Sequence, residues 1–446
     1  MKILVDDMPV TCQEGDLLID VLINNSIEIP HFCYQQDLGT DGNCRMCMVE
    51  IKGQKRPQIA CNTFVCENLE VATKSEKINE IKRSILELEL LNHPVDCPIC
   101  DQAGECKLQD YYMEFGLYES NLCTPKTKKG KNIELGSGVV LDQERCVLCM
   151  RCVRFTSEMT KTGELGVIGR GDGARVAVAA GHELNNPYAL NVVELCPVGA
   201  LTAKDFRFAQ RVWFLDSAES ICHGCSRGCN IFIDYNETKY TDEKVYRFRS
   251  RRNKEINLSF LCDYGRLSYK ELNEKFDTSE WNLSTCKALL QSQNKLALAS
   301  PSLSLEQLQA IQEFCHNENI TLFSLPMIDE SFGDDWLKTN DKSANLQGVR
   351  ALNIALCSES DFEASLKEAT LIINFEHPFL KQREFSEKKL LHFSSSKCKS
   401  GTLFGIANFA HENGTLINCD GVKQQFFSTQ HKSKAPRLIE LLEALK

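Results

Sequence analysis

Cysteine residues gather in four groups along the first part of this chain. The chain has 446 residues and 23 cysteines, and all but five of the cysteines lie at or before Cys262. In a reducing cytosol such cysteines are metal ligands or reactive thiols, whereas disulfide frameworks belong to secreted proteins. The spacing within each group therefore indicates which metal chemistry the chain can support.

The first group ends in a tight CRMC pair. It consists of Cys33, Cys44, Cys47 and Cys61. Four thiolates on a loop above a β framework suit a [2Fe-2S] cluster, although ten residues separate the first two cysteines where the plant-type pattern has four. A structural zinc site is the alternative, but such sites usually show two close cysteine pairs and this group has one.

The second group lies in NHPVDCPICDQAGEC. It consists of His93, Cys97, Cys100 and Cys106. Three thiolates and one imidazole can complete a [4Fe-4S] cube, and a neutral histidine ligand should make the cluster easier to reduce, as it does in Rieske centres. The alternative is a zinc site with three cysteines and one histidine.

The third group has two consecutive CxxC steps followed by a distant Cys-Pro. It consists of Cys146, Cys149, Cys152 and Cys196. This is the ligand pattern of bacterial ferredoxins. Thr156 stands where a two-cluster ferredoxin would have its next cysteine, so the group predicts one [4Fe-4S] cluster.

The fourth group consists of Cys222, Cys225, Cys229 and Cys262. Four thiolates again suit a [4Fe-4S] cube. Gly224 and Gly228 would give the backbone room to fold around it. His223 lies inside the triplet, and we expect it to be an outer-shell or exposed residue and not a ligand.

Eight cysteines belong to no group. We expect them to be small buried hydrophobic residues, since no two of them have ligand spacing, and Cys66 to be a spare beside the first group. They are Cys12, Cys66, Cys123, Cys286, Cys315, Cys357, Cys398 and Cys419.

The elements around these groups follow from local patterns. KILVDD and MPVT predict an opening hairpin, LLIDVLINN a helix, and MCMVEI and LEVAT later strands. A further helix should begin after the N-cap Ser75 and reach Asn92. Residues 124–131, TPKTKKGK, predict a solvated loop, with a docking patch as the alternative. Beyond Cys262, apolar β runs alternate with helical patterns, which predicts an α/β arrangement.

Several functional classes are excluded. The chain is 43% hydrophobic and 25% charged, as in folded globular proteins, and its net charge of −10 does not suit nucleic-acid binding over the whole surface. No apolar run approaches the length of a membrane-spanning helix, and the N-terminus lacks the features of a signal peptide. We therefore expect a cytoplasmic protein. The glycine-dense stretch GVIGRGDGAR at 166–175 contains GRGDGA, a loose match to the dinucleotide-binding fingerprint, and it is read as a loop because no convincing helix opens after it. P-loop, HExxH and GxSxG motifs are absent. We therefore expect no catalytic residues and no independent substrate site on this chain.

The four groups in this order resemble the large iron-sulfur subunit, called the G subunit, of bacterial NADH-quinone oxidoreductase, which is respiratory complex I. The matching segments cover roughly residues 1–270 and are PHFCY, GNCRMCMVE, NHPVDCPICDQAGECKLQD, RCVLCMRCVRFT, NVVELCPVGALTAK, CSRGCN and FLCDYGRLSY. The resemblance implies an α+β multidomain chain. Its parts would be a β-grasp [2Fe-2S] ferredoxin-type domain at 1–76, a histidine-ligated [4Fe-4S] module at 77–123, a ferredoxin-like [4Fe-4S] domain at 132–214, a molybdopterin-oxidoreductase-type [4Fe-4S] segment at 215–271 and a shortened α/β domain at 272–446.

The resemblance also implies a function. In that family electrons pass from NADH through FMN on a neighbouring chain, cross the clusters and proceed to quinone, while the membrane arm moves protons. The implied partners are the NADH/FMN-binding chain, a small [2Fe-2S] chain and the quinone-proximal iron-sulfur chains, on the inner face of the cytoplasmic membrane. The alternatives are the diaphorase-side iron-sulfur subunit of an NAD-linked hydrogenase or formate dehydrogenase, and a structural zinc or scaffold protein.

Two features depart from the family pattern. The gap between Cys229 and Cys262 is longer than usual, which places an insertion near NETKYTDEK. The tail after Cys262 is also much shorter than in full-length members of the family. We therefore expect no molybdopterin and a trimmed α/β platform in its place.

Overall fold

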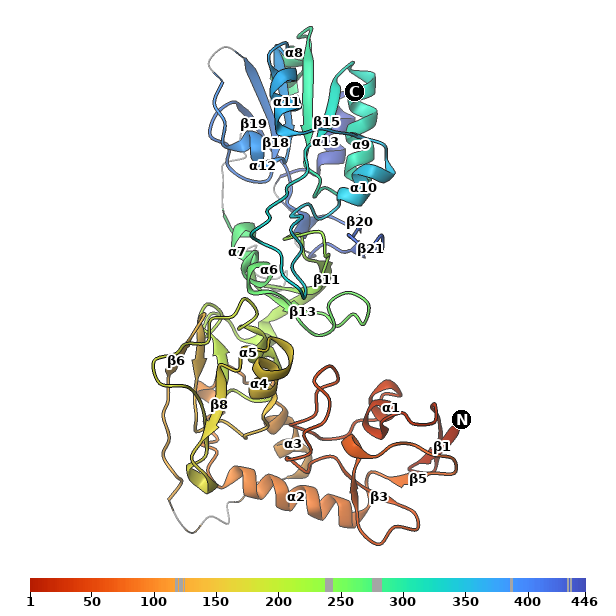
Figure 1. Ribbon diagram of the computed structural model, residues 1–446, viewed down its shortest axis with the longest axis vertical. Coiled ribbons are helices and arrows are strands. Elements are labelled where there is room, and N and C mark those ends of the chain that lie inside the picture. The colour runs from red at the N-terminus through yellow and green to blue at the C-terminus, as the bar shows by residue number, and fades with distance from the viewer. Residues whose placement is uncertain are drawn as a thin grey trace. The chain divides into compact units, whose positions relative to one another are not determined.

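The computed structural model describes residues 1–116, 119, 123, 125–236, 244–274, 283–385, 388–430, 433 and 435–446. These residues form two compact units, Met1–Trp213 and Phe214–Lys446 (Figure 1). Thr124 of the expected basic loop and most of the expected insertion, residues 237–243, lie outside the described residues.

A five-stranded sheet opens the first unit. Its order is β2-β1-β5-β3-β4, with a parallel β1–β5 pair and antiparallel neighbours elsewhere. Leu18 and Leu22 of the helix pack with Ile3, Val5 and Val49 of the sheet. The predicted hairpin, helix and later strands are confirmed. Their bounds are β1 Lys2–Val5, β2 Met8–Thr11, α1 Leu18–Asn24, β3 Met48–Ile51, β4 Gln58–Ile59 and β5 Glu70–Ala72.

Helix α2, Glu76–Leu90, carries the chain to the second group. The hydroxyl of Ser75 accepts a hydrogen bond from the Ile78 N–H at 3.2 Å, which confirms the predicted N-cap. The helix ends two residues earlier than expected, so His93 lies beyond its end. Helix α3, Lys107–Phe115, follows Cys106 and ends at Gly116, whose φ of 65° is the left-handed conformation common after helices.

The rest of the first unit surrounds the third group. It holds an antiparallel sheet of order β10-β7-β6 and a separate β8–β9 hairpin. Residues 166–175 are thus only partly a loop, because strand residues flank the turn Gly171–Gly173; that expectation was too simple. The bounds are β6 Ile133–Gly136, β7 Val139–Leu141, α4 Arg151–Arg154, the π-turn Phe155–Met159, β8 Leu165–Ile168, β9 Arg175–Val178, α5 Asn191–Leu195 and β10 Leu201–Ala203.

The second unit begins with an antiparallel sheet of order β11-β12-β13. The fourth group lies between its first two strands and before the short helices that follow it. The bounds are β11 Leu215–Ile221, β12 Asn230–Asn236, β13 Val245–Ser250, α6 Asp263–Leu267 and α7 Tyr269–Leu272.

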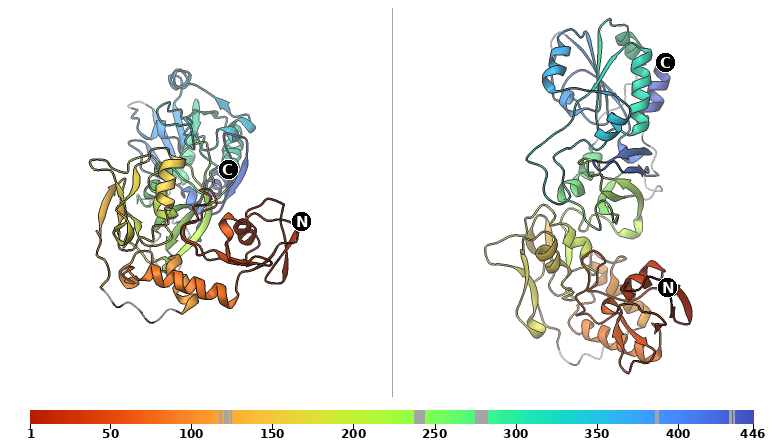
Figure 2. Two further views of the ribbon diagram at one scale, coloured as in Figure 1. Left: turned by 60° about the horizontal axis from the view of Figure 1, so that its bottom comes forward. Right: turned by 45° about the vertical axis from the view of Figure 1, so that its right-hand side comes forward.

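A six-stranded parallel sheet follows, as the α/β pattern predicted. Its order is β16-β15-β14-β17-β18-β19, the doubly wound order in which the chain runs outward in both directions from a central strand. Helices α8, α9, α10 and α13 contribute to the core on one face, and α11 and α12 to the core on the other (Figures 1 and 2). The bounds are α8 Leu283–Leu290, β14 Lys295–Ala299, α9 Leu305–Asn317, β15 Thr321–Ser324, α10 Leu346–Ala351, β16 Ala355–Leu356, α11 Glu359–Leu366, β17 Leu371–Phe375, α12 Pro378–Lys381, β18 Lys389–Ser394, β19 Thr402–Gly405 and α13 Leu438–Leu445.

The hairpin of β20, Gly414–Ile417, and β21, Lys423–Phe426, packs against the start of α9. A Cβ atom added to Gly414 would lie 2.6 Å from Cβ of Ser304, and Glu306 accepts hydrogen bonds from the backbone and hydroxyl of Thr415. In sheets of this order, ligands bind outside the carboxyl ends of the strands where the order reverses. The hairpin lies against the helix that leaves the central strand at that end.

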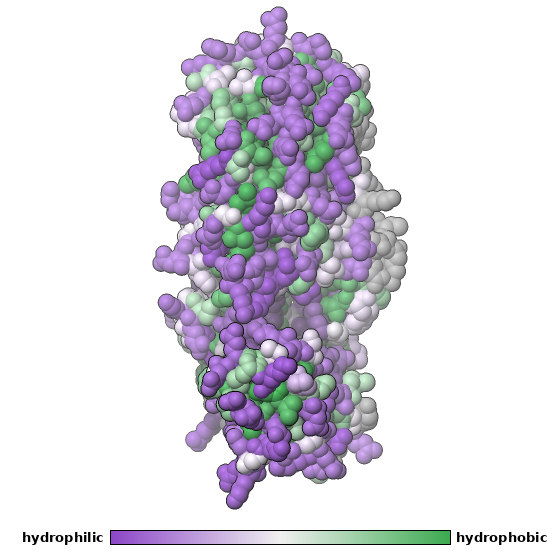
Figure 3. All heavy atoms as spheres, turned by 90° about the vertical axis from the view of Figure 1, so that its right-hand side faces the viewer, coloured by the Kyte–Doolittle hydropathy of each residue, from purple (hydrophilic) through white to green (hydrophobic). Residues whose placement is uncertain are grey.

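On the face drawn in Figure 3, the surface is mostly hydrophilic and carries several apolar patches. Within the described ranges, no helix combines the length and apolar character needed to span a bilayer.

Candidate metal centres

The first group converges beside β3. Cys44 and Cys47 lie on the loop before this strand, and Cys61 lies in the 3-10 turn Ala60–Asn62. All four thiols are buried. Hydrogen bonds between the thiols lower the pKa of Cys33 and of Cys47, while the same bonds raise that of Cys44 and of Cys61.

The backbone also points at this group. The N–H groups of Phe32 and Cys33 donate to Sγ of Cys44 at 3.4 and 3.5 Å. Arg45 reaches the left-handed φ of 58° inside CRMC. Hydrogen bonds to sulfur tune the reduction potentials of iron-sulfur clusters, and these two N–H groups point at a candidate ligand.

The second group contains three thiols that act on one another and, separately, the neutral imidazole of His93. The charges of Cys97 and Cys100 act on Cys106, and burial raises the pKa of Cys106 to about 11. Burial lowers the pKa of His93 to about 4, and its buried Nδ1 has no hydrogen-bond partner. A neutral imidazole with an available nitrogen is the form that binds metals. The charges acting most on His93 are those of Asp96 and Arg145.

The third group lines one small cavity together with apolar side chains, among them those of Val176 and Val198. Burial raises the pKa of Cys146 to about 11 and that of Cys149 to about 12. The connecting residues Leu148 and Met150 have φ values of 49° and 64°, which few side chains other than glycine adopt readily. These turns let the consecutive cysteines face the same cavity.

The fourth group closes between β11, β12 and α6. Its four thiols are buried, and burial raises the pKa of Cys262 to about 11. Sγ of Cys262 accepts from the N–H of Gly265 at 3.3 Å, and Sγ of Cys222 accepts from that of Gly224 at 3.4 Å. The ring of His223 stacks on Phe409 with centroids 4.0 Å apart, and its Nδ1 lies 3.0 Å from the Ile221 carbonyl oxygen.

Two glycines next to the sulfur atoms were not singled out from the sequence. A Cβ atom on Gly199 would lie 2.2 Å from Sγ of Cys100, and one on Gly265 would lie 2.8 Å from Sγ of Cys222. Gly199 follows Cys196 of the third group, yet it borders a thiol of the second. Their position shortly after a cysteine, in CPVG and CDYG, was the available signal.

The donor sets fit iron-sulfur clusters. Burial raises the pKa of four thiols of the third and fourth groups, so these thiols are neutral at pH 7 unless a positive charge stabilises the thiolates; they belong to Cys146, Cys149, Cys196 and Cys222. Bound iron supplies that charge, because a coordinating thiol is deprotonated. For the part of the chain that is described, no three His, Cys, Asp or Glu side chains form a site for a single metal ion.

The ungrouped cysteines only partly match expectation. Cys12, Cys286 and Cys315 are buried in hydrophobic cores, as predicted. Cys66 and Cys123 are exposed, so for them the prediction of burial was wrong. Cys66 lies in the turn before β5, outside the sheet core.

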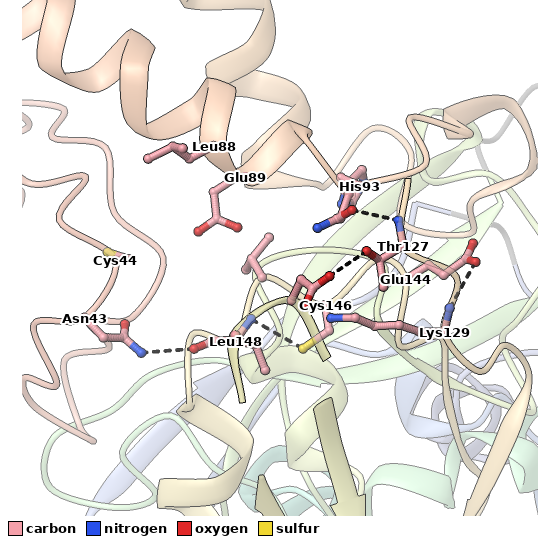
Figure 4. Close-up of a pocket in the computed structure, with 14 residues that line it drawn as sticks. Asn43, Cys44, Leu88, Glu89, His93, Thr127, Lys129, Glu144, Cys146 and Leu148 are labelled. Carbon is pink, nitrogen blue, oxygen red and sulfur yellow. Dashed lines mark hydrogen bonds between the residues drawn. The ribbon is translucent and has the colours of Figure 1, made fainter. Parts of the chain in front are cut away.

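A cavity of about 300 Å³ reaches the first three groups, because Cys44, His93 and Cys146 all line it (Figure 4). Glu89 points into it, and burial raises the pKa of this carboxyl to about 7. At its edge the Asn43 side-chain amide donates to the Leu148 carbonyl at 3.0 Å. This bond joins the loop of the first group to the loop of the third.

Arginines of α4 add further links between these loops. Arg151 donates to the carbonyls of Tyr34 and Leu195, which adjoin Cys33 and Cys196. Arg154 donates to the Cys33 carbonyl at 2.7 Å. Burial lowers the pKa of Arg151. Neither arginine was singled out from the sequence.

Three family models match the first unit. They are the 2Fe-2S iron-sulfur cluster binding domain at residues 1–76, the NADH-ubiquinone oxidoreductase-G iron-sulfur binding region at 82–121, and the ferredoxin-like domain of NADH-quinone oxidoreductase subunit 3 at 136–202. The first unit thus contains 2Fe-2S and 4Fe-4S ferredoxin-like domains.

Curated relatives carry matching names. The NADH-ubiquinone oxidoreductase 75 kDa subunit of Reclinomonas americana is 29% identical over 469 residues, covering 98% of this chain and 66% of the relative. The G subunit of NADH-quinone oxidoreductase from Streptomyces coelicolor is 34% identical over 273 residues, covering 61% of this chain and 32% of the relative. The G subunit from Rickettsia bellii is 31% identical, covering 72% of this chain and 50% of the relative.

Among solved structures, a crystal structure of an NAD⁺-reducing [NiFe]-hydrogenase in the H₂-reduced state is similar. It has 28% identity and a TM-score of 0.43, and the match covers 47% of this chain and 90% of that one. The chain spans between about one third and two thirds of the length of the curated relatives described above. The chain thus has homologues that are named the G subunit of NADH-quinone oxidoreductase or the 75 kDa subunit of NADH-ubiquinone oxidoreductase, and it contains the iron-sulfur binding region named after the G subunit.

Proposed function

We propose that this chain is an iron-sulfur electron-transfer subunit of NADH-quinone oxidoreductase, complex I. It would relay single electrons from the NADH/FMN module toward quinone, and the assembled complex would couple this transfer to proton translocation. The observation that supports the proposal is the order of the four donor groups, most of whose thiols are buried, within a chain whose homologues bear this name. The chain itself would bind no NADH or quinone.

We assign the donors as follows. The first group would hold one [2Fe-2S] cluster and the other three one [4Fe-4S] cluster each, and no molybdopterin is expected. When bound, the clusters supply one-electron redox chemistry. The protein holds the sulfur and imidazole donors, directs N–H groups at Cys44, Cys222 and Cys262, and excludes water from buried thiols. The domains would be those at 1–76, 77–123, 132–214, 215–271 and 272–446.

The proposed partners are the NADH/FMN-binding chain, the small [2Fe-2S] chain and the quinone-proximal iron-sulfur chains. The chain would then lie peripherally on the inner face of the cytoplasmic membrane, held there by the complex. A diaphorase-side subunit of an NAD-linked hydrogenase or formate dehydrogenase would share the first three groups. The fourth group and the GTLIN segment of the tail favour complex I over that alternative.

The test is anaerobic purification of the intact native assembly, followed by identification of its chains, metal analysis and low-temperature EPR. We expect complex I chains and about 14 iron atoms per copy of this chain, from one binuclear and three cubane centres. Partner chains contribute iron of their own, so the count is made on the full-length chain expressed alone and loaded anaerobically. A nickel or molybdenum catalytic subunit in the assembly would support the alternative. Bound zinc without reducible clusters would reject both.

A further inference from the structure

Helix α4 places two guanidinium groups in the interior of the first unit. Arg151 and Arg154 are each 9% exposed, and they lie on either side of Cys152. Over the residues that the structure describes, neither arginine forms an ion pair with a carboxylate. The Nε of each is buried and has no acceptor.

The hydrogen bonds of Arg151 are to backbone carbonyls at two metal sites. Its guanidinium donates to Leu195 at 3.2 Å, next to Cys196 of the third group, and to Tyr34, next to Cys33 of the first group. The nearby thiolate charges come from both groups as well, since Cys149, Cys196 and Cys33 all act on the Arg151 charge.

The hydrogen bonds of Arg154 go to the first group alone. It donates to the carbonyls of Cys33, Leu38 and Gly39 at 2.7, 3.0 and 3.2 Å. These carbonyls belong to the loop that leaves Cys33.

A buried cation without an anion is costly, and carbonyl dipoles supply only part of the compensation. A cluster held by four thiolates is a net anion, and reduction adds one more negative charge. The two arginines and the first and third clusters therefore satisfy one another electrostatically. A nearby positive charge favours the reduced cluster, because reduction brings the electron toward it.

We propose that Arg151 and Arg154 are the counter-charges of the bound clusters, with Arg151 shared between the first and third sites and Arg154 serving the first. They raise the reduction potentials of those clusters by offsetting the negative charge that each electron adds. This inference rests on the cluster assignment proposed above.

The test is an EPR-monitored redox titration of the purified complex, with dithionite as the electron donor. We expect Arg151→Gln to make reduction at least tenfold less favourable at both the first and the third cluster, a shift of about 59 mV for a one-electron couple. Arg154→Gln should shift the first cluster and leave the third near its wild-type value. Arg151→Lys, which keeps the charge, should stay close to wild type.

The matched control is Arg175→Gln. Arg175 is an exposed arginine of the same unit, and its guanidinium donates to the Gly173 carbonyl at 3.2 Å. The Arg175→Gln variant should leave the reduction potentials of all clusters unchanged. Unchanged potentials in Arg151→Gln, with both EPR signals present, would overturn the inference. Missing cluster signals in the wild type would instead reject the proposed function.

If Arg151→Gln assembles neither cluster, the iron content of Arg151→Lys distinguishes a need for charge from a need for shape. Retention of both clusters in Arg151→Lys supports a requirement for positive charge at this position. Loss of both clusters in Arg151→Lys means that the shape of the arginine, and not its charge, is what the sites need, and this contradicts the proposal.

Discussion

The cysteines of the third site differ from the neighbouring spare thiols in burial and in what surrounds them. Cys149 is buried among other thiols, whereas Cys66 is exposed. We expect Cys149→Ala to lose the third cluster, because three thiolates leave one iron without its protein ligand. Cys66→Ala should keep every cluster.

Iron content and the EPR spectrum of the two variants, purified in parallel, provide the measurement. Quinone reduction by the assembled complex should fall in Cys149→Ala and stay at the wild-type rate in Cys66→Ala. A cluster lost from Cys66→Ala would show that the ligand assignment of the first group is wrong.

Glu412 gives the second unit a pH-dependent stability. Burial raises the pKa of this carboxyl to about 7 from a usual 4.5. The folded state thus holds the proton more tightly than the unfolded state, so stability falls as pH rises from about 4.5 to about 7 and stays low above that. The difference between these values corresponds to an upper bound of about 3 kcal/mol.

We therefore expect Glu412→Gln to unfold at a higher temperature than wild type at pH 8, and at nearly the same temperature at pH 5. Thermal unfolding of the full chain at the two pH values measures this. Glu443→Gln, a change at an exposed position on α13, is the control and should show no such pH dependence. Equal effects of Glu412→Gln at both pH values would contradict the burial argument.

Which residues could be found from the sequence depends on whether their signal is local. The four groups were visible because consecutive ligands are close together in the chain. Gly199 was not, because the sulfur that it borders belongs to Cys100, almost a hundred positions earlier. Arg151 could not be found from the sequence either, because its proposed role depends on a hydrogen bond to the Tyr34 carbonyl, and only the folded chain brings Tyr34 close to Arg151.

At the scale of elements, α9 starts with a reciprocal cap. The Ser304 hydroxyl accepts from the Gln307 N–H at 3.2 Å, and the Gln307 side chain accepts from the Ser304 N–H at 3.1 Å. Ser304→Ala leaves a helix N–H without its partner, and we expect it to lower the free energy of unfolding by about 1 kcal/mol.

Denaturant unfolding of the full chain, followed by circular dichroism, measures this loss. Ser365→Ala, on α11, removes a hydroxyl that donates to the Asp361 carbonyl of the same helix, and it should change stability by less than about 0.5 kcal/mol. Equal losses in the two variants would mean that the cap does not stabilise α9.

Local patterns also account for which elements were predicted. Ser75 marked the start of α2, and strict apolar runs marked β14 and β17. The β8–β9 hairpin was not predicted from the sequence, because the glycines of its turn indicate a loop and its paired strands are short, within residues 165–178. The order of the parallel strands depends on crossovers of many residues, which no local pattern encodes.

At the scale of the whole molecule, we expect the stability of the two units to depend on metal to different degrees. The main core of the parallel sheet contains residues such as Leu308, Ile311 and Phe375 and none of the proposed ligands. The first unit instead contains the thiols of three groups, most of which are buried. Iron should therefore stabilise the first unit far more than the six-stranded sheet.

Calorimetry of the full chain before and after anaerobic iron chelation tests this. We expect the transition of the first unit to move to lower temperature, and a second transition, that of the parallel sheet, to stay in place. Loss of the visible absorbance confirms that the clusters have been removed. A single transition that shifts as a whole would show that the two units unfold together.

The loops of the first three groups contact and hydrogen-bond one another. Gly199 lies against Cys100, the Asn43 side chain donates to the Leu148 carbonyl, and Arg151 donates to carbonyls at two of the sites. Filling one site thus already orders backbone that a neighbouring site needs. We expect maturation of this unit to be cooperative, so that cells starved of iron accumulate empty and fully loaded chains with few partly loaded ones between them.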